Sequence, residues 1–148
     1  MIRFTRKSVV AAAAAGAGAA ALTFAAAPTA TAAPEICPSL PGQTSAGANC
    51  YSSSGPTGLT LAITADGGVA VSTGNNFSGP AAIALGPGAV VEMQGVNPGL
   101  SIGIAGPGAT VVVDGQNRVQ CTDGISFAGD FQTWSGCFNN GTTQIPLG

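Results

Sequence analysis

The chain contains no histidine, and among its 148 residues it has only four basic residues and one tryptophan. Without histidine, neither a Ser-His-Asp nor a Cys-His catalytic arrangement can form. The cysteine spacings contain no C-x-x-C knuckle, which argues against a zinc site. So little positive charge excludes the basic footprint that nucleic-acid binding requires. We therefore expect no nucleic-acid partner, no metal and no cofactor.

Three of the four basic residues stand near the N-terminus, ahead of an apolar stretch over 9–27. The triplet Ala30-Thr31-Ala32 follows and is typical of a signal-peptide cleavage site. We expect 1–32 to be a cleaved signal peptide, and the protein to be secreted, either extracellular or in the cell envelope. A retained anchor is the alternative, but Ala and Gly rather than Leu and Ile build the stretch. No second apolar span follows, so we expect no membrane span in the mature chain.

The mature chain would keep one basic residue, Arg118, and all six acidic residues, a formal charge of −5. It would also keep all four cysteines, and an even number of cysteines in an exported chain predicts disulfides. Three pairings are possible. Because one pair lies near each end of the mature chain, we favour Cys37–Cys50 with Cys121–Cys137.

Between the cysteine pairs, the chain breaks into short apolar runs that end at Gly, Pro-Gly, Asn or Asp-Gly, as strands end at tight turns. The runs are 59–64, 69–73, 81–85, 89–93, 100–104 and 109–113. Runs begin at Val69, Ala89 and Ala109, a period of about 20 residues that is typical of stacked repeats. The interval from Leu85 to Ile104 is one short of this period, so one turn must absorb a slip.

This period predicts an all-β fold, a β-solenoid or β-roll with two strands per coil. Each coil is too thin to bury its own apolar side chains, and stacked coils would share a continuous core. A small β-meander or sandwich of antiparallel hairpins is the alternative.

Alternation within the runs predicts which side chains are buried, because successive side chains of a strand point to opposite faces. In the first run we expect Leu59, Leu61 and Ile63 to face the core and Thr60 and Thr64 to face solvent. Applied to every run, this puts Val, Ile and Leu inside and Thr, Ser and Ala outside.

We divide the mature chain into three parts. They are a cysteine-containing N-terminal cap (33–58), a Gly-rich β repeat (59–118) and a cysteine-containing aromatic C-terminal cap (119–148). Terminal segments of different sequence protect the open ends of a solenoid, and the disulfides would staple them. We expect the last coil to be covered by Phe127, Phe131, Trp134 and Phe138.

The Ala-rich leader, the cysteine pair at each end and the Gly-punctuated run 81–88 resemble a group of small secreted actinobacterial proteins, known only as a domain of unknown function. That resemblance implies no catalytic residues. A shorter stretch, 82–90, is similar to the β-roll heads of trimeric adhesins, although the period here is longer and no coiled-coil stalk is present. The second resemblance supports a β-roll.

Carboxylate pairs are the remaining candidates for acid–base chemistry. The acidic residues are Glu35, Asp66, Glu92, Asp114, Asp123 and Asp130. Three of them precede Gly, which is typical of turns, and Glu92 falls on an outward strand position. We therefore predict no catalytic site.

The sequence predicts a non-enzymatic secreted protein that is structural or surface-associated in the cell envelope. The alternative is an extracellular module that binds a protein or a glycan, with Phe131 and Trp134 as the candidate residues. A small hydrolase using Glu92 and Asp130 is a third hypothesis. The partner is not specified: self-association through exposed strand edges or an envelope partner would both fit.

Overall fold

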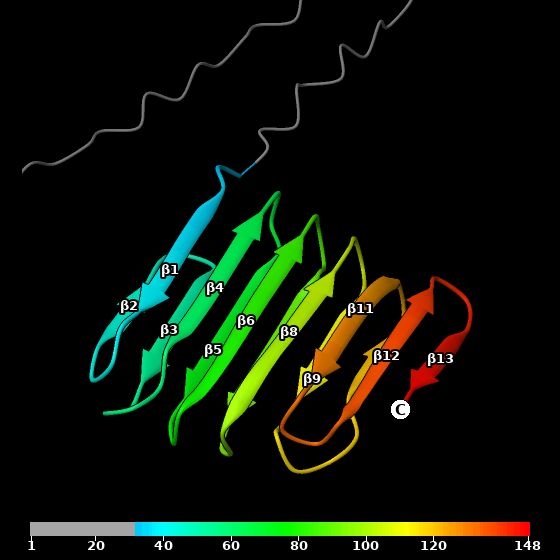
Figure 1. The fold of residues 1–148 in the computed structure, drawn as a ribbon. Helices are drawn as coiled ribbons and strands as arrows, with labels where there is room; N and C mark the ends of the chain where they lie inside the picture. Colours follow the sequence, from blue (N-terminus) through cyan, green and yellow to red (C-terminus); the bar gives the residue numbers. More distant parts are fainter. Residues whose placement is uncertain (1–31) are drawn as a thin grey trace, which may run out of the picture.

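The computed structural model describes residues 32–148, which form two stacked β-sheets (Figure 1). Every regular element in that range is a strand, which confirms the predicted all-β class. Residues 32–148 contain no helix long and apolar enough to cross a membrane. The predicted signal peptide lies, but for Ala32, outside the described residues.

The larger sheet has seven strands and lies in front in Figure 1. They are β1 (Glu35–Ser39), β4 (Thr60–Ala65), β6 (Ser78–Leu85), β8 (Gly99–Ala105), β11 (Ile125–Asp130), β12 (Ser135–Asn140) and β13 (Gln144–Leu147), in the spatial order given. The strands β4, β6 and β8 run parallel to one another. Antiparallel strands flank them, β1 on one side and β11, β12 and β13 on the other.

The smaller sheet lies behind and has six strands. They are β2 (Thr44–Ala46), β3 (Cys50–Ser54), β5 (Val69–Gly74), β7 (Val90–Gly95), β9 (Thr110–Val113) and β10 (Gln120–Thr122). The strands β3, β5, β7 and β9 are parallel neighbours. From β3 to β9 the chain crosses to the other sheet after every strand, and so it winds as a solenoid of about 3 turns. The predicted solenoid is confirmed, and the meander alternative is wrong.

The length of one coil is read from the strand pairing. Ile63 pairs with Ile83, which confirms the predicted period at this step, whereas Ile83 pairs with Ile104, one position beyond that period. The extra residue lies in the turn 86–89 between β6 and β7, where the preceding coil has only 66–68. One turn therefore absorbs a one-residue slip, as predicted, and it makes this coil longer, because Ile104 pairs with Ile83 and not with Leu85.

Small side chains line the interior of the solenoid. Ala62, Ala82 and Gly103 stand at the same inward position of β4, β6 and β8. Thr60 and Thr64, which we predicted to face solvent, are 2% exposed. The predicted orientation of β4 is therefore wrong: its leucine and isoleucine side chains point outward, and the same inversion holds in β6 and β8.

The inversion has a steric cause. A Cβ atom added to Gly103 would lie 2.9 Å from Cγ1 of Val111 and 3.1 Å from Cγ1 of Val91, both on the opposite sheet. The short turns hold the sheets so close that the small sheet can place valines inside only if the large sheet offers glycine, alanine, serine or threonine. Alternation shows that two faces of a strand differ, but it does not show which one is buried.

Both predicted disulfides are confirmed, Cys37–Cys50 and Cys121–Cys137. The first joins β1 to β3 and the second joins β12 to β10, so each links the large sheet to the small one across the interior. Two disulfides fit an oxidising or extracellular environment.

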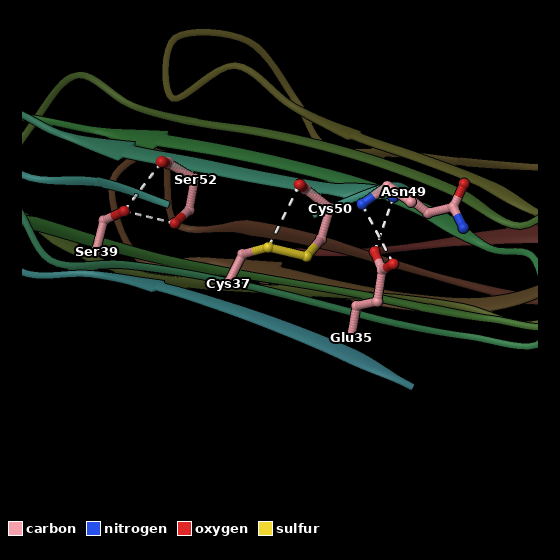
Figure 2. Close-up of a disulfide and its surroundings, with 7 residues drawn as sticks. Glu35, Cys37, Ser39, Asn49, Cys50 and Ser52 are labelled. Atoms are coloured by element: carbon pink, nitrogen blue, oxygen red, sulfur yellow. Dashed lines mark hydrogen bonds between the residues drawn. A yellow bond between two sulfur atoms is a disulfide. The ribbon is translucent and has the colours of Figure 1, made fainter. Parts of the chain in front are cut away.

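Polar contacts accompany the first disulfide (Figure 2). Further along the same strands, the hydroxyl oxygens of Ser39 and Ser52 lie 2.6 Å apart in a buried hydrogen bond. At the other side of the bridge, the carboxylate of Glu35 accepts a hydrogen bond of 2.8 Å from the backbone N–H of Asn49. The N-terminal strands are thus joined by covalent and polar contacts rather than by large apolar side chains.

The aromatic side chains do not cover the last coil as predicted. Phe127 and Phe138 point to the outer face of the large sheet, and Phe131 and Trp134 lie in the turn after β11. All four are exposed. The interior, which has no room for a side chain at Gly103, cannot accept an aromatic ring. The cap and repeat boundaries at 58 and 118 stay predictions.

Candidate functional site

The outward side chains of the large sheet form a continuous apolar surface, called here the apolar face. One row crosses all seven strands, because each member pairs with the next. The row consists of Ile36, Ile63, Ile83, Ile104, Phe127, Phe138 and Ile145. Around it lie Leu61, Leu85, Leu100, Ile102, Ile125 and Leu147. The apolar face therefore extends over the whole width of the large sheet, whose seven strands are labelled in Figure 1.

The apolar face carries no charge at the outward positions of its seven strands, and Asn140 is the one polar side chain among them. Leu100 is 67% exposed and Ile36 is 65% exposed. Monomeric soluble proteins rarely expose a contiguous apolar patch larger than a few hundred Å². A surface of this kind is a candidate contact site.

The outer face of the small sheet is different. Its central row consists of Tyr51, Val71, Glu92, Val112 and Gln120. A neighbouring row is Ser53, Thr73 and Gln94. The molecule thus presents one apolar face and one face of mixed polarity, on opposite sides of the same narrow interior.

A hollow of about 230 Å³ lies at the C-terminal end of the apolar face, lined largely by apolar atoms. Gly129 and Gly136, paired across β11 and β12, are part of its lining. Phe131 and Trp134 stand beside them, edge to face, with ring centroids 5.7 Å apart. This glycine hollow is smaller than the ~300 Å³ at which small-molecule sites begin, so it suits a single side chain or ring.

Hydrogen bonds fix the turn that carries these two rings. The carboxylate of Asp130, 3% exposed, accepts hydrogen bonds from the backbone N–H and the Nε2 of Gln132, each 3.0 Å, and from the hydroxyl of Thr133 at 2.8 Å. The side-chain oxygen of Gln132 in turn accepts from the N–H groups of Val96 and Asn97. The turn is therefore held from β11 and from the loop between β7 and β8. Both predicted binding residues, Phe131 and Trp134, are brought together on it.

The acidic residues proposed from sequence are spread over separate elements. Asp66 and Asp123 occupy turns at positive φ, 53° and 69°. Glu92 lies on the outer face of the small sheet, whereas Glu35 and Asp130 are hydrogen-bonded acceptors in the two ends. Over 32–148 no group of three His, Cys, Asp or Glu side chains is placed to hold a metal ion. The pair Glu92 and Asp130 lies on different sheets.

The carboxylate of Asp114 accepts hydrogen bonds within its own loop. The side-chain amide of Asn117 donates to its carboxylate, and the backbone N–H groups of Asn117 and Gln116 donate as well, at 2.7 and 2.9 Å. These donors, the Asn117 side chain above all, lower the pKa of Asp114. Its charge closes the loop after β9, as expected of an Asp-Gly turn.

A second hollow, of about 380 Å³, lies beside β10, β12 and β13. Arg118, Gln120, Ser135 and Gln144 are among its lining residues. None of these residues carries a carboxylate side chain. The apolar face with its glycine hollow is the stronger candidate for a functional surface. The sequence predicts Phe131 and Trp134 as binding residues, which stays a prediction, and it does not predict the apolar face, because alternation places the aliphatic side chains in the core.

Residues 74–140 match the model of a family of unknown function (DUF6764). The match runs from the end of β5 to the end of β12 and includes Cys121–Cys137 and the aromatic turn. It covers slightly less than half of the chain. The expected resemblance to a family of unknown function is confirmed over these residues, whereas its actinobacterial and secreted character stays a prediction. No curated protein and no solved structure matches the chain.

Proposed function

We propose that the protein is a secreted, non-enzymatic structural protein associated with the cell envelope, and that the apolar face is its contact surface. The carrying observation is a seven-stranded surface without a charged side chain. Aliphatic side chains on this scale are unfavourable in water, at about 25 cal/mol per Å² of apolar area. The two disulfides support a site of action outside the reducing cytosol.

Cell fractionation tests this proposal. The protein is expected in the envelope fraction, released by detergent but not by high salt, because an apolar contact is insensitive to screening. Ile83→Lys with Phe127→Lys puts two charges into the central row of the apolar face. Burying an unpaired charge is costly, so we expect at least about a tenfold drop in the retained fraction, or ~1.4 kcal/mol.

The matched control is Val71→Lys with Val112→Lys, two positions with the same spacing in the central row of the small sheet. This variant should be retained as the unchanged protein is. Circular dichroism shows whether both variants are folded. Equal retention of both folded variants, or recovery of the unchanged protein in the medium alone, would contradict the proposal.

A second candidate function is an extracellular binding module that uses the glycine hollow. The observation in its favour is the exposed Phe131–Trp134 pair beside a glycine-lined depression. The lining favours an apolar side chain of a protein over a sugar, because the oxygens of Asp130 already accept three hydrogen bonds. A glycan would leave its hydroxyls without partners there.

Trp134 is the single tryptophan of the chain, so its fluorescence reports on the hollow directly. We expect N-acetyl-leucine amide to shift its emission to the blue with saturation, and an N-acetylglucosamine oligomer to leave it unchanged. Gly129→Val is the control: a Cβ at this position meets only Cζ of Phe127, at 4.0 Å, so the variant fills the hollow without a clash. A saturating shift that survives in Gly129→Val would place the binding elsewhere.

A further inference from the structure

The area of the apolar face can be compared with the area that a protein–protein interface buries. Seven strands about 4.8 Å apart and six residues long at ~3.3 Å each span about 34 by 20 Å, or ~650 Å² in plan. Protruding side chains give an accessible area larger than the plan area. A specific interface of standard size buries ~800 Å² on each partner. The apolar face is therefore as large as one whole side of a stable protein–protein interface.

The relief of the face suits a second sheet. The central row from Ile36 to Ile145 forms a ridge of large side chains across all seven strands. In the adjacent row, Ala81, Gly129 and Gly136 leave gaps between large side chains. Two sheets packed face to face interdigitate their side chains at a separation of ~10 Å. If a two-fold axis lies between the central row and the adjacent row, the ridge of each copy packs into the gaps of the other.

Charge distribution separates the possible partners. The described residues carry six acidic side chains and one arginine, and none of them lies on the apolar face. A second copy can thus approach without bringing like charges together. An anionic lipid surface would attract basic residues, of which the described part of the chain has only Arg118, outside the apolar face. A charged protein partner would find no complementary group on the face.

We propose that the apolar face binds a second copy of this chain, with the two large sheets packed face to face around a two-fold axis. The pair presents its two small sheets outward, so that Ser, Thr, Gln and Glu92 side chains meet solvent. The inference rests on the proposed function in one respect, that the apolar face is a contact surface, and it places a second copy on that face instead of an envelope component. It adds the partner, which makes the structural unit a dimer.

Sedimentation of the purified protein with intact disulfides tests the pairing. At about 10 µM, a concentration that populates an interface of standard size, we expect a mass of two chains. Ile83→Lys with Phe127→Lys should give a mass of one chain, with a dissociation constant raised at least about a hundredfold. Val71→Lys with Val112→Lys should remain a dimer. Circular dichroism confirms the fold of each variant.

Flotation with neutral phosphatidylcholine vesicles provides the alternative arm. An unchanged protein that sediments as one chain and floats with the vesicles overturns the pairing in favour of a lipid surface. A single-chain mass without flotation also overturns it, as does a dimer that persists when the apolar face is charged. These results are independent of the envelope role. A dimer recovered only in the medium supports the pairing and contradicts the envelope role. A single chain that detergent releases from the envelope supports the envelope role and contradicts the pairing.

Discussion

Gly103→Val is expected to destabilise the protein by ~3 kcal/mol or more, or to prevent folding. A Cβ at this position already approaches Cγ1 of Val111 at 2.9 Å, Cγ1 of Val91 at 3.1 Å and Sδ of Met93 at 3.2 Å. All three atoms belong to the opposite sheet, so relief requires the two sheets to separate. Separation would strain the short turns on both sides of the coil. Urea unfolding followed by far-ultraviolet circular dichroism measures the loss.

The control is the same substitution on the other side of the same sheet. Gly129 lies on β11, next to β8, but faces outward, with open space around an added Cβ. Gly129→Val should be neutral or slightly stabilising, because valine suits a strand better than glycine does. If both variants lose the same stability, the interior is wider than the contacts at Gly103 indicate, and the steric explanation of the inverted faces fails.

The period, the turns and the disulfide pairing were predictable from sequence because each depends on local features. Gly and Pro mark tight turns wherever they occur, and a recurring turn sets the length of a coil. Cysteines near each end had nearby partners. The turn that holds the extra residue was harder to predict. It is the turn after β6, and the strands that flank it have sequences similar to those of the neighbouring coils.

The orientation of the strands was not predictable from alternation alone. The usual assumption buries the larger apolar residue, but here volume limits what the interior accepts. A signal was present: the positions of Ala62, Ala82 and Gly103 are uniformly small from coil to coil. The adjacent outward positions hold an isoleucine in every coil, Ile63, Ile83 and Ile104. Uniform smallness in register is thus the better indicator of the inside of a narrow solenoid.

The candidate surface follows from the same inversion. Phe131 and Trp134 are predicted as binding residues from their residue types alone, because aromatic side chains are enriched at interfaces, and their binding role stays a prediction. The isoleucines of β4, β6 and β8 were assigned to the core and therefore not considered. Because these isoleucines point outward, they form part of the apolar face and do not contribute to the core. What then holds the fold together is backbone pairing, a narrow interior and the two covalent links.

Removal of either disulfide is accordingly expected to cost about 3 kcal/mol. Cys121→Ala with Cys137→Ala opens a loop of 16 residues, and Cys37→Ala with Cys50→Ala one of 13. Closing a loop of about 15 residues contributes ~3 kcal/mol through the entropy of the unfolded chain. For a domain of this size we expect the melting temperature to fall by roughly 10 °C for each bridge. Thermal unfolding followed by circular dichroism measures the melting temperature. In the unchanged protein, excess reductant should lower it by the sum of the two losses.

A matched pair of residues separates the covalent link from the contacts around it. Ser39 and Ser52 join the same two strands as Cys37 and Cys50, with the same separation along the chain, but only by a buried hydrogen bond. Replacing both with alanine removes the two hydroxyls together and takes the Ser39 donor away from the backbone carbonyl of Ser52, so we expect a loss of at most about 1 kcal/mol. A loss at the serine pair equal to that at the cysteine pair would mean that packing between β1 and β3 supplies the stability. A loss at the cysteine pair alone means that a solenoid without large core side chains depends on its covalent links.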